Sequence, residues 1–249
     1  MFTSEWREKT RQEILEAAKS DSRISGGAIT GSGSVGQLDS WSDIDLAFGV
    51  RDAAEISAVL DTYTKRMYEE YQALHHLDVK SGAWIYRVFL LANTLQVDLA
   101  FAPQEQFGAR ANTFKLVFGK TGNISHDPTT PLEVYAGWVW LYALHVRSSL
   151  KRGRLWQAEF FVSGMRDYLI SIACRRHRVL EYQGRGVDKL PPEELKKFEP
   201  TLVRSMDLPE LERVFSALVK LYLEEMASLD MALYSRIVAA LNELASKAS

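Results

Sequence analysis

Several features that mark special classes of protein are scarce in this chain of 249 residues. Its one cysteine, Cys174, cannot form a disulfide within the chain, so a disulfide-stabilised secreted domain is not predicted. The longest strongly apolar stretch, Val134–Leu144, is about half the roughly 20 residues that a membrane-spanning helix needs. No apolar signal segment stands within Met1–Lys19. We therefore expect a cytoplasmic protein with no membrane partner.

Charge of one sign is also lacking. The 30 basic and 32 acidic side chains leave a net charge of −2, which provides no field of the kind that attracts DNA or RNA. A content of 47% hydrophobic and 25% charged residues is ordinary for a globular protein. The composition thus predicts a globular chain, for which we do not expect a nucleic-acid partner.

The glycine content and the spacing of apolar residues change near Pro128–Pro131. This change predicts a boundary between a domain of residues 1–130 and one of residues 131–249. The first part holds ten of the fifteen glycines and most of the alternating apolar runs, which favours an α/β (α+β) domain with a mixed sheet. Strands are expected at 42–50, 77–80, 84–91 and 95–101, and helices at 4–18 and 52–74. A short apolar piece at 24–30 precedes a glycine-rich segment.

Long helical periods with few turn signals follow in residues 131–249 and predict an all-α bundle. Its helices are expected at 132–150, 155–174, 208–226 and 229–244. The apolar face of the last helix suits either the core of the bundle or the contact of a homodimer.

Three carboxylates stand in strand-like surroundings. Asp43 and Asp45 are two residues apart, so in an extended strand their side chains project to the same side. Two carboxylates held that close repel each other unless a cation lies between them. Asp98, within Gln96–Phe101, repeats the pattern, and a neighbouring strand would place it beside the first two. Three oxygen ligands with open positions suit Mg²⁺.

A glycine-rich loop, GSGSVG at Gly31–Gly36, precedes the first two carboxylates. Glycines allow the backbone conformations and close approach that a phosphate tail demands, while Ser32 and Ser34 offer hydroxyl donors. No Gly-Lys-Ser/Thr follows, so the loop is not a P-loop, and the paired acids after it differ from a dinucleotide fingerprint. We predict a phosphate-binding loop of another kind.

The order Gly31-Ser32, Asp43-Ile44-Asp45 and Asp98 resembles the signature of the nucleotidyltransferase superfamily, which includes DNA polymerase beta. The signature covers residues 24–101. A compact catalytic domain followed by a helical domain is similar to the enzymes that adenylylate aminoglycoside or lincosamide antibiotics. The segments GNISHDPTTP (122–131) and KRGRLWQAEFF (151–161) add to that closer resemblance.

The resemblance implies a Mg²⁺-dependent enzyme that moves a nucleoside monophosphate, AMP from ATP, to a hydroxyl of a small molecule and releases pyrophosphate. Asp43 and Asp45 would ligate Mg²⁺, and Asp98 would be either a third ligand or the base that receives the acceptor's proton. Two divalent ions would hold the attacking and the leaving oxygen.

The resemblance further implies that Ser32 and the backbone of Gly31 and Gly33 bind the triphosphate, and that Ser42 helps to position it. Either serine would equally suit a turn or a cap. Many members have a basic residue directly after Gly-Ser, whereas this chain has Gly33. Neutralisation of the triphosphate is therefore expected from the metal and from the basic C-terminal part.

In the antibiotic enzymes the helical domain supplies acidic and aromatic side chains to the acceptor. The residues of this chain that the resemblance brings forward for that role are Trp138, Trp156, Glu159 and Asp167. Two other interpretations stay open: an enzyme that adenylylates a protein, for example in a toxin–antitoxin pair, and a nucleotide-binding module without catalysis.

Overall fold

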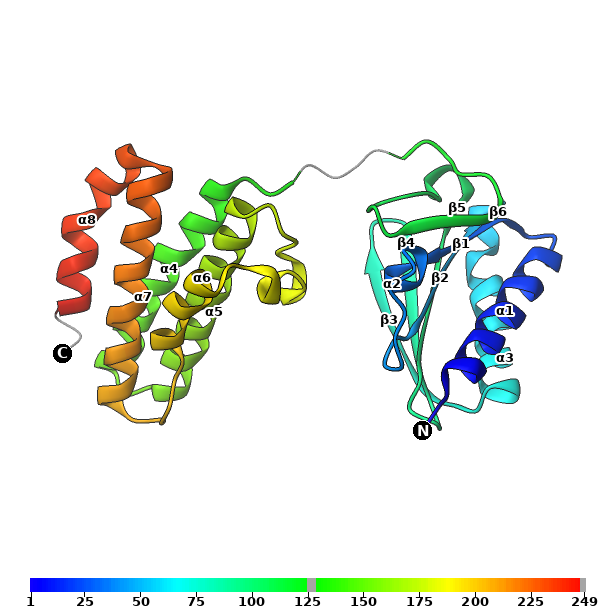
Figure 1. The fold of residues 1–249 in the computed structure, drawn as a ribbon, viewed down its shortest axis with the longest axis horizontal. Coiled ribbons are helices and arrows are strands. Elements are labelled where there is room, and N and C mark those ends of the chain that lie inside the picture. Colours follow the sequence, from blue (N-terminus) through cyan, green and yellow to red (C-terminus); the bar gives the residue numbers. More distant parts are fainter. Residues whose placement is uncertain (125–128, 247–249) are drawn as a thin grey trace. The chain divides into compact units, whose positions relative to one another are not determined.

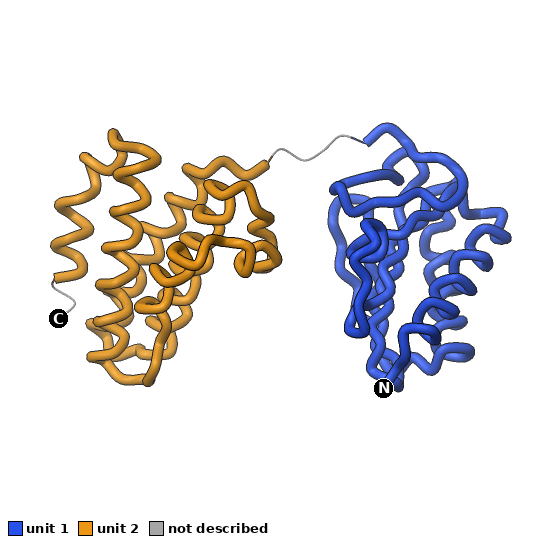
Figure 2. Tube along the Cα trace, in the orientation of Figure 1, with its two compact units in different colours: residues 1–127 blue, residues 128–249 orange. Residues whose placement is uncertain are grey.

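A computed structural model describes residues 1–124 and 129–246 of the chain. The chain divides into two compact units, Met1–Asp127 and Pro128–Ser249 (Figure 2). Pro128, the first residue of the expected boundary, lies outside the described residues. Each unit has its own hydrophobic core.

Unit 1 is built on a six-stranded sheet of order β3-β4-β5-β2-β1-β6 (Figure 1). The strands are β1 (Ile24–Thr30), β2 (Ile44–Val50), β3 (Ala73–Ser81), β4 (Trp84–Leu91), β5 (Gln96–Pro103) and β6 (Phe114–Gly119). Only the β2–β5 pair is parallel among the described strands, so the sheet is mixed, as expected. The unit's helices are α1 (Ser4–Ser20), α2 (Gly31–Ser34) and α3 (Ile56–Glu70), with short 3₁₀ turns at Ala53–Glu55 and Gln104–Gln106.

One face of the sheet is covered by α1 and α3 (Figure 1). The Thr3 hydroxyl accepts a hydrogen bond from the Trp6 backbone N–H, at 3.2 Å, and caps α1. Burial along α1 follows one stripe, which includes Ile14 and Leu15 and also, against expectation for a charged side chain, Arg7. The strands contribute their even-numbered residues in β2 and odd-numbered residues in β5 to this core.

The opposite face carries a smaller aromatic core. Trp84 and Phe107 pack there against small residues of β2 and β5, among them Ala47 and Ala100. The alanine side chains at the centre of this face extend less far from the sheet than the aromatic side chains beside them. Because side chains alternate along a strand, Asp45 lies on the same face as Ala47.

Unit 2 is an α-helical bundle, as predicted. Its helices are α4 (Leu132–Lys151), α5 (Leu155–Arg176), α6 (Pro192–Phe198), α7 (Leu208–Leu229) and α8 (Met231–Ser246), with 3₁₀ turns at Tyr182–Gly184, Val187–Lys189 and Glu199–Thr201. Residues such as Val139, Leu169 and Phe215 are fully buried between α4, α5 and α7. The apolar face of α8 packs on this core through Leu241 and Leu244, so the bundle uses it. No described helix has both the length and the apolar character needed to cross a bilayer.

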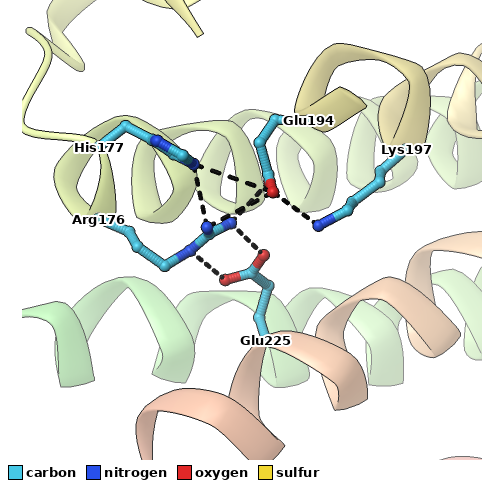
Figure 3. A network of polar contacts seen from close by, with 5 residues as sticks. All are labelled: Arg176, His177, Glu194, Lys197 and Glu225. Atoms are coloured by element: carbon cyan, nitrogen blue, oxygen red, sulfur yellow. Dashed lines mark hydrogen bonds and ion pairs between the residues drawn. The ribbon is translucent and has the colours of Figure 1, made fainter. Parts of the chain in front are cut away.

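A network of charged side chains joins α5, α6 and α7 (Figure 3). Arg176 donates to Glu194 at 2.7 Å and to Glu225 at 2.9 Å, and both carboxylates are nearly buried. Lys197 donates to Glu194 at 2.7 Å. Burial opposes the ionisation of Glu194, but the hydrogen bonds from Arg176 and Lys197 outweigh it and lower the pKa of Glu194 to about 2.

Three expectations for unit 1 need correction. The helix expected at 52–74 ends at Glu70, because Gln72 takes a φ of +56° and breaks the helical path before β3. The strand expected at 42–50 begins at Ile44, so Asp43 immediately precedes it. The expected strands do not include Phe114–Gly119, an edge strand with no fully buried residue and therefore a weak pattern.

Candidate functional site

Two of the three carboxylates come from neighbouring strands, Asp45 from β2 and Asp98 from β5, and Asp43 immediately precedes β2. In the parallel pairing of β2 and β5, Asp45 stands opposite Asp98. Opposed residues of adjacent strands project to the same face of a sheet, so these two side chains share a face. Asp43 lies one residue before β2, and Gln96 Nε2 lies 3.4 Å from its Oδ2. The sequence predicts that Asp98 lies beside the pair, and the register agrees with that geometry.

The glycine loop lies directly against this acidic face. Gly31 follows β1, has a φ of +58°, and a Cβ at this position would lie 2.0 Å from Asp45 Oδ2. No side chain can occupy that space while the carboxylate stays in place. The close approach explains why glycine stands at residue 31, and it brings the turn of α2 next to Asp45.

The two serines of the turn differ in their contacts. Ser34 Oγ donates to the Gly31 carbonyl at 2.8 Å and closes the turn. Ser32 uses its carbonyl to accept from the Gln37 N–H at 3.1 Å, and its hydroxyl makes no hydrogen bond to the residues that the structure describes. Of the two, Ser32 has the hydroxyl available for a ligand.

Ser42 is engaged in a different turn. Its hydroxyl accepts from the Asp39 N–H and donates to Asp39 Oδ1, both at 2.9 Å. The Trp41 N–H also donates to Asp39 Oδ1, and these bonds to the carboxylate, first that from Trp41 and then that from Ser42, lower the pKa of Asp39. The geometry therefore gives Ser42 the role of a turn residue.

Arg7, on α1, makes hydrogen bonds to the backbone of this turn. Its side chain lies in the buried stripe of α1, and Nη1 donates to the carbonyls of Asp39 and Ser42. The carbonyl of Ser42 belongs to the peptide that leads into Asp43, so Arg7 positions the first carboxylate of the site. Sequence reasoning missed this residue. The available signal was an arginine within the apolar stripe that Ile14 and Ala18 define.

The carboxylates of this site are suitable ligands for a divalent cation, although by themselves they do not complete its coordination shell. Carboxylate oxygens on one face beside an open glycine turn are the donors that Mg²⁺ prefers. In the described ranges 1–124 and 129–246, no group of three or more His, Cys, Asp and Glu side chains is close enough to hold a metal ion. A site that binds one or two carboxylates together with the oxygens of a nucleotide's phosphates needs no such cage.

Unit 2 contains a cavity of about 460 Å³ along α5. Its acidic lining residues are Glu159 and Asp167, and Tyr142 and Tyr168 supply aromatic faces. Ser163 lies between the acids and donates to Glu159 Oε1 at 2.6 Å. Partial desolvation raises the pKa of Asp167, Arg166 opposes the rise, and the nearby Glu159 adds to it.

The aromatic residues expected near the acceptor fall in two groups. Trp138 stacks on Tyr168, with ring centroids 5.9 Å apart and planes inclined by 8°, and it meets Tyr142 edge-on. Gly164 makes room for Tyr142, since a Cβ there would lie 2.4 Å from its ring. Trp156 is 79% exposed and is not among the residues that line the cavity. The structure thus brings Glu159 and Asp167 together in the lining of one cavity. Trp138 contacts two of the lining residues without lining the cavity itself, and Trp156 is also outside the lining.

Comparison with known proteins finds similarity in structure alone. No protein-family model matches the chain, and no curated protein matches it. An aminoglycoside 6-adenyltransferase from Bacillus subtilis is 14% identical, with a TM-score of 0.41, over 98% of this chain and 99% of that chain. A nucleotidyltransferase-like protein from Exiguobacterium sibiricum is 14% identical, with a TM-score of 0.45, over 94% of this chain and 80% of that one. At this identity and these scores, the likeness says nothing about the chemistry of this chain, which depends on its own residues.

Proposed function

We propose that the protein is a nucleotidyltransferase that moves AMP from ATP to a hydroxyl group of a small molecule. One observation carries the proposal: Asp45 and Asp98 stand opposite each other in the β2–β5 register, with Gly31 pressed against the Asp45 carboxylate. Acids on the same face beside a glycine turn suit a phosphate chain bound together with a cation, because the acids alone would repel it.

Each residue then has a defined task. Asp43 and Asp45 would hold a divalent cation together with oxygens of the phosphates. Asp98 would be either a further ligand or the base that receives the acceptor's proton. Ser32 and the backbone of residues 31–33 would hold the triphosphate. A divalent cation such as Mg²⁺, when bound there, would neutralise phosphate charge and stabilise the oxygens of an in-line displacement. Arg7 keeps the peptide before Asp43 in place. Ser42, predicted to help position the triphosphate, forms a turn with Asp39. Through this turn it would help Arg7 to hold the peptide before Asp43.

The reaction balances without any other reactant. The acceptor oxygen forms a bond to the α-phosphorus, the bond from that phosphorus to the oxygen bridging to the β-phosphate breaks, and pyrophosphate leaves with the bonding electron pair. The acceptor's proton passes to a base, for which Asp98 is the candidate because it lies on the face shared with Asp45. Positioning and electrostatics supply most of the rate enhancement in such transfers.

The cavity of unit 2 is the proposed acceptor site. Glu159 and Asp167 give it negative charge, and Tyr142 and Tyr168 give it aromatic faces that attract cations. An acceptor that combines hydroxyl groups with ammonium groups fits this chemistry, as aminoglycosides do. The overall positive balance of residues 131–249 gives no support for such an acceptor, but the local charge of the cavity is acidic.

Pyrophosphate release is the decisive measurement. The purified chain is given ATP and Mg²⁺ with each of a panel of aminoglycosides and lincosamides, and the nucleotidylated product is identified by its mass. We expect release with an acceptor that carries ammonium groups, and loss of release in Asp45→Asn. Asp167→Asn should raise KM for the acceptor with little change in KM for ATP. Release that persists in Asp45→Asn would refute the assignment.

A nucleotide-binding module without catalysis is the second candidate. It is favoured by the finding that the described residues hold no ready group of three metal-ligating side chains. Binding of ATP, measured by calorimetry with Mg²⁺ and with a chelator, separates the two. Affinity that is indifferent to Mg²⁺, together with no pyrophosphate release from any acceptor, supports the module and contradicts the enzyme.

A further inference from the structure

Arg11 of α1 lies against the underside of the glycine turn. A Cβ placed on Gly33 would stand 3.2 Å from Arg11 Nη1 and 3.1 Å from a methyl of Ile29. The guanidinium is largely enclosed, with 15% of the side chain exposed. A side chain on residue 33 would therefore crowd the guanidinium, which would have to shift by a few tenths of an ångström.

The contacts of this guanidinium leave part of it available. Arg11 Nη2 donates to Glu8 Oε1 at 2.6 Å, and Nε is buried without a hydrogen-bond partner among the described residues. Glu8 is 51% exposed, so water can solvate its carboxylate if Arg11 turns to another anion. The Arg11 guanidinium thus has an ion pair with Glu8 that can exchange for another anion, and its Nε–H is not used by the described residues.

The turn itself has no positive charge. Residues 30–37 read TGSGSVGQ and include no lysine or arginine. A triphosphate brought next to Asp43 and Asp45 therefore meets carboxylates, and the Arg11 guanidinium lies beside Gly33 of the same turn. In surroundings poorly accessible to water, a guanidinium a few ångströms away acts strongly on such a ligand.

We propose that Arg11, on α1, supplies the positive charge by which the glycine turn binds a polyphosphate. Residue 33 is glycine because a side chain there would crowd the Arg11 guanidinium. The inference rests on the proposed function, because it takes a nucleoside triphosphate as the ligand of the turn. It also shifts the expected source of neutralisation from unit 2 to a residue of unit 1. Arg11 binds and steers phosphate; it takes no part in bond making.

Removal of the charge is the first test. Arg11→Gln is compared with Lys9→Gln, which deletes a charge from an exposed position of the same helix. Calorimetry measures the binding of AMP, ADP and ATP with Mg²⁺. We expect Arg11→Gln to weaken ATP binding about tenfold, a loss equal to one charge-assisted hydrogen bond, ADP less, and AMP hardly at all. Lys9→Gln and Arg11→Lys should stay within about twofold of wild type.

Relocation of the charge is the second test. In the Arg11→Gln background, Gly33→Lys places an ammonium group on the turn, in the volume that the guanidinium leaves. We expect this double variant to regain most of the ATP affinity, and Gly33→Lys alone to lose affinity through crowding with Arg11. Recovery depends on charge and cannot follow from repair of packing alone, and thermal unfolding of each variant shows that it is folded.

The outcomes separate the two proposals. If the wild-type chain binds ATP and Arg11→Gln binds it equally well, the inference about Arg11 is overturned and the proposed function stands. The same holds if Arg11→Gln weakens AMP and ATP equally, or if the double variant recovers nothing. If the wild-type chain binds no nucleoside triphosphate, the proposed function fails and the role of Arg11 fails with it.

Discussion

In unit 2, Glu194 and Glu225 are nearly buried and both accept hydrogen bonds from Arg176. In unit 1, the pairing of two strands brings Asp45 opposite Asp98, one carboxylate beside another. Burial of a carboxylate is costly unless a cation and hydrogen bonds compensate it. The first arrangement satisfies that condition with side chains of the protein. In the second, two carboxylates on one face of the sheet suit a divalent cation that arrives with a ligand. The contrast separates charge that serves stability from charge that serves function.

The largest expected effect comes from removing charge in unit 1. Asp45→Asn should reduce nucleotidyl transfer at least about a thousandfold, because the site loses one of the carboxylates that hold the cation at the transferring phosphate. The same variant should stay within about 1 kcal/mol of wild type in stability, because asparagine has nearly the shape of aspartate. Activity assays and thermal unfolding of the same preparation test both halves. A variant that is inactive because it unfolds would contradict the interpretation.

Removing the cation from the network in unit 2 should have the opposite character. Arg176→Met leaves Glu194 and Glu225 facing each other with little access to water, and we expect a loss of about 3–5 kcal/mol in the free energy of unfolding of this unit. Lys220→Met is the matched control, because Lys220 pairs with Glu224 on the surface at 3.9 Å and should cost close to nothing. Chemical denaturation followed by circular dichroism measures both. Equal losses in the two variants would remove the distinction between buried and surface pairs.

Gly31→Ala tests the contact between the turn and the acidic face. The new Cβ would overlap Asp45 Oδ2 and would also stand at a φ of +58°, so either the carboxylate or the turn must move. We expect a loss of roughly a hundredfold in kcat/KM and a cost of about 1–2 kcal/mol in stability. Gly36→Ala has a similar φ of +70° with open space around the added methyl, so it should show the backbone cost alone. Equal activities of the two variants would show that the contact with Asp45 is unimportant.

Much of this arrangement is predictable from the sequence, because short-range patterns determine it. The strand Trp84–Leu91 has the predicted bounds. Alternation predicts that Asp43 and Asp45 project together if both lie in one strand, and this stays a prediction because β2 begins at Ile44. The opposition of Asp45 and Asp98 depends on the register between strands about fifty residues apart, and no local pattern specifies it.

The charged residues under the turn were not predictable in the same way. Arg7 and Arg11 lie on a helix that already satisfies an amphipathic pattern through Ile14 and Leu15, so its arginines are attributed to the solvent side. Their contacts with residues 33–42 arise from how α1 packs against the sheet. The role expected for Ser42 at the phosphate site stays a prediction. The hydrogen bonds of its hydroxyl with Asp39 depend on the turn, which its spacing in the sequence does not reveal.

Acid should weaken unit 2 through Glu194. Its pKa in the folded chain is about 2, below the ordinary 4.5, so the folded state binds the proton less tightly than the unfolded state. The stabilisation is therefore fully present above about pH 4.5 and is lost as the pH falls toward 2. Unfolding of the wild type and of Glu194→Gln between pH 6 and pH 2.5 gives the comparison, and the variant's stability should depend less on pH across this range. Parallel curves would exclude Glu194 as the source.

The smallest expected effects distinguish two serines. Ser32→Ala removes a hydroxyl that makes no hydrogen bond within the described residues, so it should raise KM for ATP by about tenfold and leave stability within about 0.5 kcal/mol. Ser42→Ala removes a hydroxyl that both accepts from and donates to Asp39, so it should cost about 1 kcal/mol in stability and change KM less than threefold. Steady-state kinetics and denaturation of both variants complete the test. If Ser42→Ala proved the more harmful to KM, the hydroxyl would contact the triphosphate after all, and the turn with Asp39 would have to open when ATP binds.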